Sequence, residues 1–282
     1  MHPTKIDWCD SVWNFVTGCT PVSPGCAHCY AKRMAHRLRG RYGYPDDDPF
    51  RVTLHPERLA EPLGKRKPQN IFVCSMADLF HKDVPTEFRD KAVAVMALCR
   101  QHTFLCLTKR AERMAEYCLA RETYGRVDLA ALRQFRVEKD PARLLTLRGP
   151  WQPGPNMDRF IQTWPPPNIW LGVSAEDQER LDERAPHLVK LAAAGWHTFL
   201  SLEPLLGGLN VTPYLGDIGA GILGAESGPG ARPMDPDWAR AVRDQCKAAG
   251  VPFFLKAMDA KKNRVLDGRT HDELPWARKK RP

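Results

Sequence analysis

The sequence predicts an α/β protein built on a parallel sheet and folded as a partial or complete (β/α) barrel. Short apolar runs recur along the chain, helical patterns lie between them, and 282 residues suffice for one large barrel. The runs are continuously apolar rather than alternating, as in parallel strands that are covered on both faces. We therefore expect a single domain over residues 1–282.

Apolar runs mark the expected strands. In chain order they are Ile71–Ser75, Thr103–Thr108, Ile169–Ser174, Thr198–Leu202, Gly221–Ala225 and Pro252–Lys256. Val12–Thr17 is a weaker candidate for a strand before them. Because helical segments separate successive runs, the strands should lie parallel, with their carboxyl ends at one edge.

Three segments between the strands have the residue spacing of amphipathic helices. Thr86–Gln101 is the clearest, and we expect its threonine to cap the start. In Arg180–Ala194, Pro186 predicts either the true start of the helix or a kink. Pro236–Ala249 begins with proline and is followed by glycine, the usual order of start and stop signals.

Two insertions interrupt this alternation, near residues 37–70 and near residues 121–168. The first is rich in Arg, Pro, Gly and Asp, and the second is basic and ends in a proline-rich stretch. Structureless loops of this length are uncommon in a compact domain. Each insertion should therefore carry short helices or cover a site.

The net charge of +9 suits a polyanionic partner such as nucleic acid. A basic surface that only aids solubility would give the same net charge. The tail Ala277–Pro282 is locally basic and could reach a phosphate backbone. No run approaches the roughly 18 apolar residues of a membrane span, and the first residues do not resemble a signal peptide. We expect a cytoplasmic protein without a membrane partner.

Nine cysteines are present, an odd number, which together with the lack of a signal peptide argues against a disulfide framework. Five of them lie in apolar or helical surroundings and should be small buried side chains: Cys74, Cys99, Cys106, Cys118 and Cys246. The other four, all before position 30, need a different explanation.

The segment Gly18–Ala31 reads GCTPVSPGCAHCYA, and its prolines and glycines predict a loop in which thiolates can converge. Soft thiolate ligands select zinc or an iron–sulfur cluster. A structural zinc site needs four ligands, and either Cys9 or His28 could supply the fourth. The spacing alone leaves both metals open.

Cys19, Cys26 and Cys29, followed by Tyr30 and a helix, resemble the radical S-adenosylmethionine (SAM) superfamily. The usual spacing there is Cys-x3-Cys-x2-Cys, whereas six residues separate the first two cysteines here. Other segments resemble, in order, a radical-SAM-related group of conserved phage and bacterial proteins: CSMADLFHKDVP, LTKRAERM, IWLGVSAED, FLSLEPLLG, GAESGPGARPMDPDWARAVRDQC and VPFFLK. The resemblance spans nearly the whole chain and implies a barrel of the radical SAM type with irregular insertions.

This resemblance implies that Cys19, Cys26 and Cys29 hold a [4Fe–4S] cluster whose fourth iron binds SAM. An electron from a flavodoxin- or ferredoxin-like donor would cleave SAM to a 5′-deoxyadenosyl radical, which would take hydrogen from a substrate. His28 stands where that superfamily often has an aromatic residue beside the last cysteine.

Polar residues follow the predicted strands, where the barrel edge would form a site. With His28, the expected cofactor contacts are Ser75, Asp78, Lys109, Ser174, Glu176, Glu203, Glu226 and Ser227. Ser174 or Glu176 is the candidate for the SAM ribose, and Lys109 or Arg110 for the SAM carboxylate. Each residue alone could instead cap a helix or form a structural ion pair.

The substrate could be DNA, RNA or a nucleotide, and a base inside a duplex would have to be flipped out. Tyr42, Tyr44, Trp151 and Trp164 could stack on bases or simply hold the insertions to the barrel. A second reading is a non-catalytic nucleic-acid-binding protein with zinc on Cys9 and the three loop cysteines. If the protein is instead a radical SAM enzyme, Cys9 is a buried structural residue or a donor of a hydrogen atom to a radical.

Overall fold

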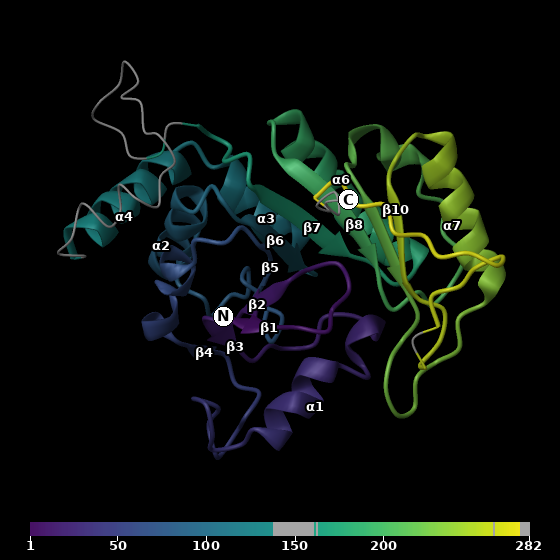
Figure 1. Ribbon diagram of the computed structural model, residues 1–282, viewed down its shortest axis with the longest axis horizontal. Helices are drawn as coiled ribbons and strands as arrows, with labels where there is room; N and C mark the ends of the chain where they lie inside the picture. The colour runs from purple at the N-terminus through teal and green to yellow at the C-terminus, as the bar shows by residue number, and fades with distance from the viewer. Residues whose placement is uncertain (138–160, 162, 262, 277–282) are drawn as a thin grey trace.

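The computed structural model describes residues 1–137, 161, 163–261 and 263–276. Its main sheet has the order β1-β2-β5-β6-β7-β8-β9-β10, and every pairing is parallel except that of β1 with β2. The strands are β1 (His2–Pro3), β2 (Ser11–Trp13), β5 (Asn70–Val73), β6 (Thr103–Thr108), β7 (Ile169–Ser174), β8 (His197–Leu202), β9 (Gly221–Gly224) and β10 (Phe253–Ala257). Since β1 and β10 are the two edges, the α/β fold is a partial barrel (Figure 1).

The six strongest predicted strands are all present and neighbour one another in chain order. The weaker run Val12–Thr17 is instead split in two. Its first half forms β2, while β3 (Val16–Thr17) leaves the main sheet and pairs antiparallel with β4 (Thr53–Leu54). This turn away from the sheet places the next residues, the cysteine loop, beside the sheet's carboxyl edge.

The helices follow the predicted alternation, and among the described residues α3 and α4 lie between β6 and β7 (Figure 1). The α-helices are α1 (Tyr30–Arg37), α2 (Thr86–Leu98), α3 (Ala111–Leu119), α4 (Thr123–Val137), α6 (Gln178–Ala193) and α7 (Pro236–Ala248). The 3₁₀ helices are η1 (Pro24–Cys26), η2 (Pro56–Arg58), η3 (Glu61–Gly64) and η4 (Thr212–Asp217).

Two predicted helix starts need correction. Thr86 is the first residue of α2 rather than its cap, because Pro85 holds the capping position. Helix α6 begins at Gln178, well before Pro186, which lies inside it. The helix starts there because Asp177 caps it: the Asp177 side chain accepts a hydrogen bond of 2.8 Å from the backbone of Arg180.

Both faces of the sheet are buried, which explains the continuously apolar runs. On β5, Ile71 and Val73 belong to the core under the helices, whereas Phe72 belongs to a second core on the inner face. The same alternation places Leu105 and Phe199 in the inner core, each fully buried. A fully buried side chain of this size contributes about 1.5–3 kcal/mol, so both cores stabilise the sheet.

The inner core is closed by the two ends of the described chain. The Trp276 indole donates to the carbonyl of Trp8 at 3.1 Å, and Asn70 donates to the carbonyl of Trp276 at 3.1 Å. The Trp8 ring lies 4.6 Å from Phe72, centroid to centroid. The concave side of the partial barrel is therefore filled by tryptophan at one end and left open at the other.

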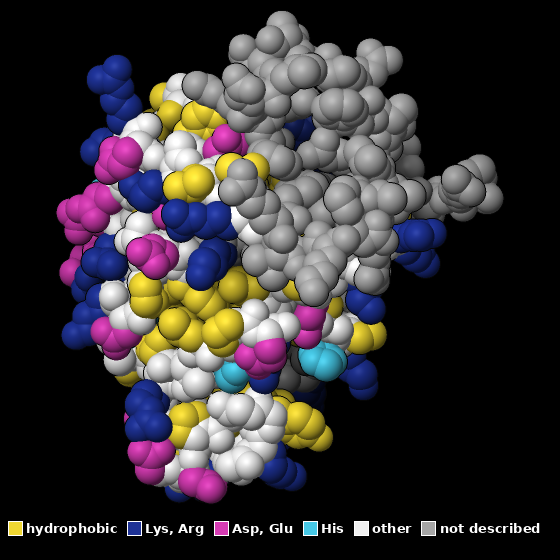
Figure 2. All heavy atoms as spheres, turned by 90° about the vertical axis from the view of Figure 1, so that its left-hand side faces the viewer, with side chains coloured by type: hydrophobic (Ala, Val, Ile, Leu, Met, Phe, Trp, Pro, Cys, Tyr) yellow, Lys and Arg dark blue, Asp and Glu magenta, His cyan; other side chains and the backbone are white. Residues whose placement is uncertain are grey.

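The insertion near residues 37–70 carries β4, η2 and η3, and the one near 121–168 begins with α4, so both contain the short elements expected of them. Trp151 and the tail 277–282 lie outside the described residues. Figure 2 shows charges of both signs interspersed over the described part of one face, around an apolar patch. Among the described helices, none is long and apolar enough to cross a membrane.

Candidate functional site

The three cysteines of the loop line one cavity. Cys19, Cys26 and Cys29 lie between β3 and α1, each partly buried, and they border a cavity of about 430 Å³. The loop contains η1, and Cys29 occupies the position just before the first residue of α1. A strand-to-helix loop carries the cysteines, as the sequence predicted.

Side chains that follow successive strands line the same cavity. The predicted residues found there are His28, Ser75, Asp78, Lys109, Arg110, Ser174, Glu203, Glu226 and Ser227, and Lys256 joins them. They come together because parallel strands in chain order bring their carboxyl ends to one edge. The strand-end pattern thus predicted the location of these side chains, and their contacts with a cofactor stay a prediction.

Glu176 departs from the expectation that it faces a cofactor. It is fully buried, does not border the cavity, and accepts hydrogen bonds from the backbone of Gly25 at 3.0 Å and from Arg184 at 3.2 Å. Burial raises its pKa, but the Ser23 hydroxyl, followed by the Lys109 charge, the Gly25 hydrogen bond and the Arg184 charge, brings the pKa below its ordinary value. Glu176 therefore holds the cysteine loop from behind.

Gly25 is required for this contact. A β-carbon at position 25 would lie 2.9 Å from the Glu176 carboxyl carbon, closer than such atoms pack. The glycine lets the loop backbone approach the carboxylate, and its amide lies next to Cys26 in the chain. The proline- and glycine-rich character of the loop thus reflects close packing as well as turns.

Two lysines that line the cavity are held by neighbouring polar groups. Lys109 hydrogen-bonds to the Ser174 hydroxyl, which in turn donates to the carbonyl of Glu203 at 3.0 Å. Glu203 forms an ion pair with Lys256 from the neighbouring strand. Burial lowers the pKa of Lys109, and the negative charge of Glu176 opposes this shift. The charged form of Lys109 is therefore stabilised by nearby carboxylates.

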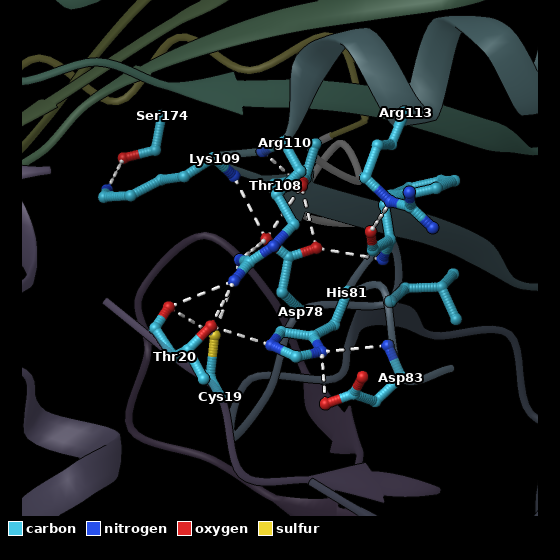
Figure 3. A network of polar contacts seen from close by, with 12 residues as sticks. Cys19, Thr20, Asp78, His81, Asp83, Thr108, Lys109, Arg110, Arg113 and Ser174 are labelled. Atoms are coloured by element: carbon cyan, nitrogen blue, oxygen red, sulfur yellow. Dashed lines mark hydrogen bonds and ion pairs between the residues drawn. The ribbon is translucent and has the colours of Figure 1, made fainter. Parts of the chain in front are cut away.

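Arg110 connects the first cysteine to a buried carboxylate (Figure 3). Its guanidinium lies 3.6 Å from the Cys19 sulfur and 3.1 Å from Asp78, and it also donates to the Thr20 carbonyl at 3.0 Å. Asp78 is fixed in turn by the Thr108 hydroxyl at 2.8 Å. Burial and Asp78 raise the pKa of Cys19 to about 11, and Arg110 opposes that shift.

A third contact fixes the loop at Pro24. Arg232 forms an ion pair with Glu226 and donates to the carbonyl of Pro24 at 3.1 Å. His28 Nδ1 lies 3.1 Å from the same Glu226 carboxylate. The Arg232 hydrogen bonds lower the pKa of Glu226 to about 2 despite its burial. The glycine-rich segment after β9 thus packs on the cysteine loop.

The donor set fits an iron–sulfur cluster better than a single ion. Among the described side chains, no three of His, Cys, Asp or Glu lie close enough together to hold one metal ion. A single zinc ion needs every sulfur within about 2.3 Å of itself, whereas a cubane binds each cysteine at a separate iron. Three thiols bordering one cavity suit the wider group.

Cys9 stands apart from the other three. Only 9% of it is exposed, its thiol points to the carbonyl of Ile6 at 3.8 Å, and it does not border the cavity in the described structure. Burial, followed by the charge of Asp10, raises the pKa of Cys9 to about 12. Its position away from the cavity is what separates Cys9 from the three loop cysteines.

Sequence reasoning missed the residues that position the loop. Arg184 is only 1% exposed and sits on the apolar face of α6, between Leu181 and Leu188. An arginine on an apolar helical stripe is a signal for a buried carboxylate partner, and it could have identified this one. Arg232 offered no such signal, because its partner Glu226 lies across a glycine-rich turn.

A family model described as "Protein of unknown function (DUF5131)" matches residues 3–275. The chain belongs to this family. A search of curated proteins finds no match. The DUF5131 assignment covers the cysteine loop and every strand that lines the cavity, so the site is part of the family's own domain.

Two solved structures similar to this DUF5131 chain are variants of spore photoproduct lyase. One, with bound AdoMet and the dinucleoside spore photoproduct, has 10% identity and a TM-score of 0.42 over 83% of this chain and 60% of that one. The other has 9% identity and a TM-score of 0.47 over 90% of this chain and 79% of that one. These scores are too low to carry a functional assignment.

Proposed function

We propose that this protein is a radical SAM enzyme that holds a [4Fe–4S] cluster on Cys19, Cys26 and Cys29. The observation that carries this proposal is the meeting of these three thiols with charged strand-end residues around one cavity. The resemblance of the ordered sequence segments to a radical-SAM-related group supports it. When bound, the cluster would supply the electron that cleaves SAM.

The chain's own residues have the chemistry to bind and orient SAM. Lys109, Arg110 and Lys256 offer cations for its carboxylate, and the Lys109 ammonium has three donors, of which one bonds to Ser174. Glu203 and Asp78 offer acceptors for its amino group and hydroxyls. The apolar part of the lining, including Phe72 and Leu107, would keep water from the reacting groups.

The buried position of Cys9 weighs against the alternative of a closed zinc site. A four-cysteine site would need Cys9 to leave its contact with Ile6 and enter the cavity. Nothing in that alternative uses the ring of charged residues around the cavity. We therefore assign Cys9 a structural role and keep its exchange as a control in the experiment below.

The substrate we propose is a nucleic acid or nucleotide, on the basis of the net charge of +9 and the cations at the site. The electron would come from an external flavodoxin- or ferredoxin-like protein. A cavity of about 430 Å³ has room for a small ligand and for part of a substrate, not for a duplex.

Anaerobic reconstitution with iron and sulfide, followed by reduction in the presence of SAM, tests the proposal. We expect a brown protein that forms 5′-deoxyadenosine, and loss of both properties in a Cys19→Ala/Cys26→Ala/Cys29→Ala variant. A Cys9→Ala variant should retain both. A colourless protein that binds zinc tightly, and loses it on Cys9→Ala exchange, would overturn the proposal.

A further inference from the structure

Helix α1 and the turn after it carry a group of cations at the surface. Lys32, Arg37, Arg39 and Arg41 are exposed, and Arg33 is half-buried. Because α1 starts directly after Cys29, which borders the cavity, this surface begins beside the cavity. We call these five residues the α1 cations.

Only one narrow side of α1 packs on the protein. Ala31 and Ala35 are buried against Tyr44, Phe50 and Met76. In Figure 1, α1 stands away from the helices that cover the sheet. Arg33 also contacts the protein, since it donates to the carbonyl of Ser227 at 3.2 Å. Lys32 and Arg37 are exposed on the rest of the helix.

Among the described residues, none of the α1 cations has a carboxylate partner, and all five lie within residues 32–41, whereas unpaired cations on other helices, such as Lys91 on α2 and Lys190 on α6, stand apart from one another. On α7, Arg243 pairs with Asp244 and Asp267, and on α6, Arg180 pairs with Glu183. Within the described residues, no ion pair involves an α1 cation. The nearest acidic stretch follows the turn, where Asp47 is already paired with Arg51. The five cations outnumber the three aspartates of this stretch, Asp46, Asp47 and Asp48, so the net field is positive and favours an anionic partner.

Apolar and aromatic side chains lie among these charges. Tyr42 is 74% exposed, Tyr30 45%, Val22 43% and Met34 40%. Tyr30 also borders the cavity, where its hydroxyl hydrogen-bonds to the carbonyl of Ser75. Exposed aromatic rings interleaved with cations are the composition of surfaces that bind single strands, since the rings stack on bases while the cations contact phosphates.

We propose that the α1 cations and Tyr42 bind the backbone and a base of a single-stranded nucleic acid, and present a neighbouring base to the cavity. The proposal rests on the proposed function for its substrate, but the binding itself needs no cluster. Four of the five cations are arginines, whose planar guanidinium suits paired contacts with phosphate oxygens. The single strand follows from the cavity, which a stacked base cannot enter.

Fluorescence anisotropy with a labelled single-stranded DNA of mixed sequence tests the surface, on full-length protein with and without reconstitution. A Lys32→Gln/Arg37→Gln variant should bind about 25-fold more weakly at about 0.1 M salt, with a salt slope smaller by about 1.4, because each phosphate contact releases about 0.7 counterion. The matched Lys91→Gln/Lys190→Gln variant removes the same charge from exposed lysines of α2 and α6, and should bind like the parent.

Tyr42→Ala provides an independent variant, since it should weaken binding about fivefold or more with an unchanged salt slope. An equal loss of affinity in Lys32→Gln/Arg37→Gln and in Lys91→Gln/Lys190→Gln would overturn the proposal, because binding would then depend only on the overall charge of the protein. Tighter α1-dependent binding of a duplex, or of an acidic flavodoxin in place of DNA, would overturn it as well. If the protein forms no 5′-deoxyadenosine but still binds DNA through the α1 cations, the proposed radical SAM activity is wrong and the proposed binding surface stands.

Discussion

At the scale of single residues, the hydrogen bond from Arg110 to Cys19 is the contact most able to tune a cluster. Hydrogen bonds and charges at ligating sulfurs set the reduction potential of iron–sulfur clusters. Arg110 also neutralises Asp78, which is only 5% exposed. Removing the guanidinium would leave a buried carboxylate near the sulfur, and would disfavour addition of an electron.

We expect Arg110→Gln to lower the reduction potential of the reconstituted cluster by on the order of 50 mV, since a tenfold change in a one-electron equilibrium is about 59 mV. Redox titration followed by electron paramagnetic resonance measures this shift. Arg113→Gln is the matched control, because Arg113 lies on the same helix and donates to the carbonyl of Phe80 instead. Equal potentials in the two variants would argue against the role of Arg110.

The Glu226–Arg232 pair predicts a dependence of stability on pH. The pKa of Glu226 is about 2 in the folded protein and 4.5 ordinarily, so the folded state binds this proton less readily. The stability that the pair contributes should be complete above pH 4.5 and should disappear as the pH falls through about 2.

The measurement is the free energy of unfolding of the parent and of Glu226→Gln between pH 2 and 7. The difference between them should be largest near neutral pH and should shrink toward pH 2. Glu183→Gln, which removes an exposed partner of Arg180, should show little difference at any pH. A constant difference for Glu226→Gln would mean that its ionisation is unimportant.

At the scale of elements, the packing of strand β7 against β8 depends on a glycine that lies beneath an aromatic ring. Gly172 lies opposite Phe199 in the sheet, and a β-carbon on Gly172 would overlap that ring. Phe199 has no exposed surface and packs on Trp8 and Trp276, so the ring has nowhere to move. The glycine in an otherwise apolar strand is thus a packing requirement.

We expect Gly172→Ala to lower the free energy of unfolding by about 1–3 kcal/mol, the usual cost of overpacking a core. Urea unfolding measures this change. Gly64→Ala is the control, because no atom lies within 4 Å of the added carbon there. Equal stability of the two variants would show that the Phe199 ring can rearrange.

The predicted elements differ in how much of them the local sequence determined. Strands β6 and β7 have the predicted bounds, since long apolar runs are buried on both faces wherever the sheet forms. The run Val12–Thr17 was predicted as one strand, and its division into β2 and β3 could not be predicted, because the division depends on the pairing of Val16 with Leu54. Such a pairing between distant segments leaves no periodicity in either one.

At the scale of the whole molecule, the cysteine loop is held by the protein itself. Glu176 holds Gly25, Arg232 holds Pro24, and Arg110 holds Thr20. At these contacts the loop uses backbone groups rather than thiols. Cys19 and Cys29 are only partly buried at the margin of a small apolar cluster that includes Phe50 and Met76. A cluster would enter a site whose loop is already ordered.

We therefore expect the Cys19→Ala/Cys26→Ala/Cys29→Ala variant, which cannot hold a metal there, to keep the far-ultraviolet circular dichroism spectrum of the parent. It should also unfold cooperatively. A structural zinc domain behaves differently, because metal binding supplies its folding free energy. Loss of folded structure in this variant would favour the zinc reading over the enzyme.

The sequence by itself determined the order of the parallel strands, the loop that carries Cys19, Cys26 and Cys29, and the polar residues at the strand ends. These follow from local composition, because apolar runs become buried strands and their ends share one edge. Only the tertiary structure decided which polar groups face the cavity. It turned Glu176 away toward Arg184 and placed Arg110 on Cys19. A carboxylate goes where a buried cation and a backbone amide stabilise its charge, and those partners come from elements distant in the sequence.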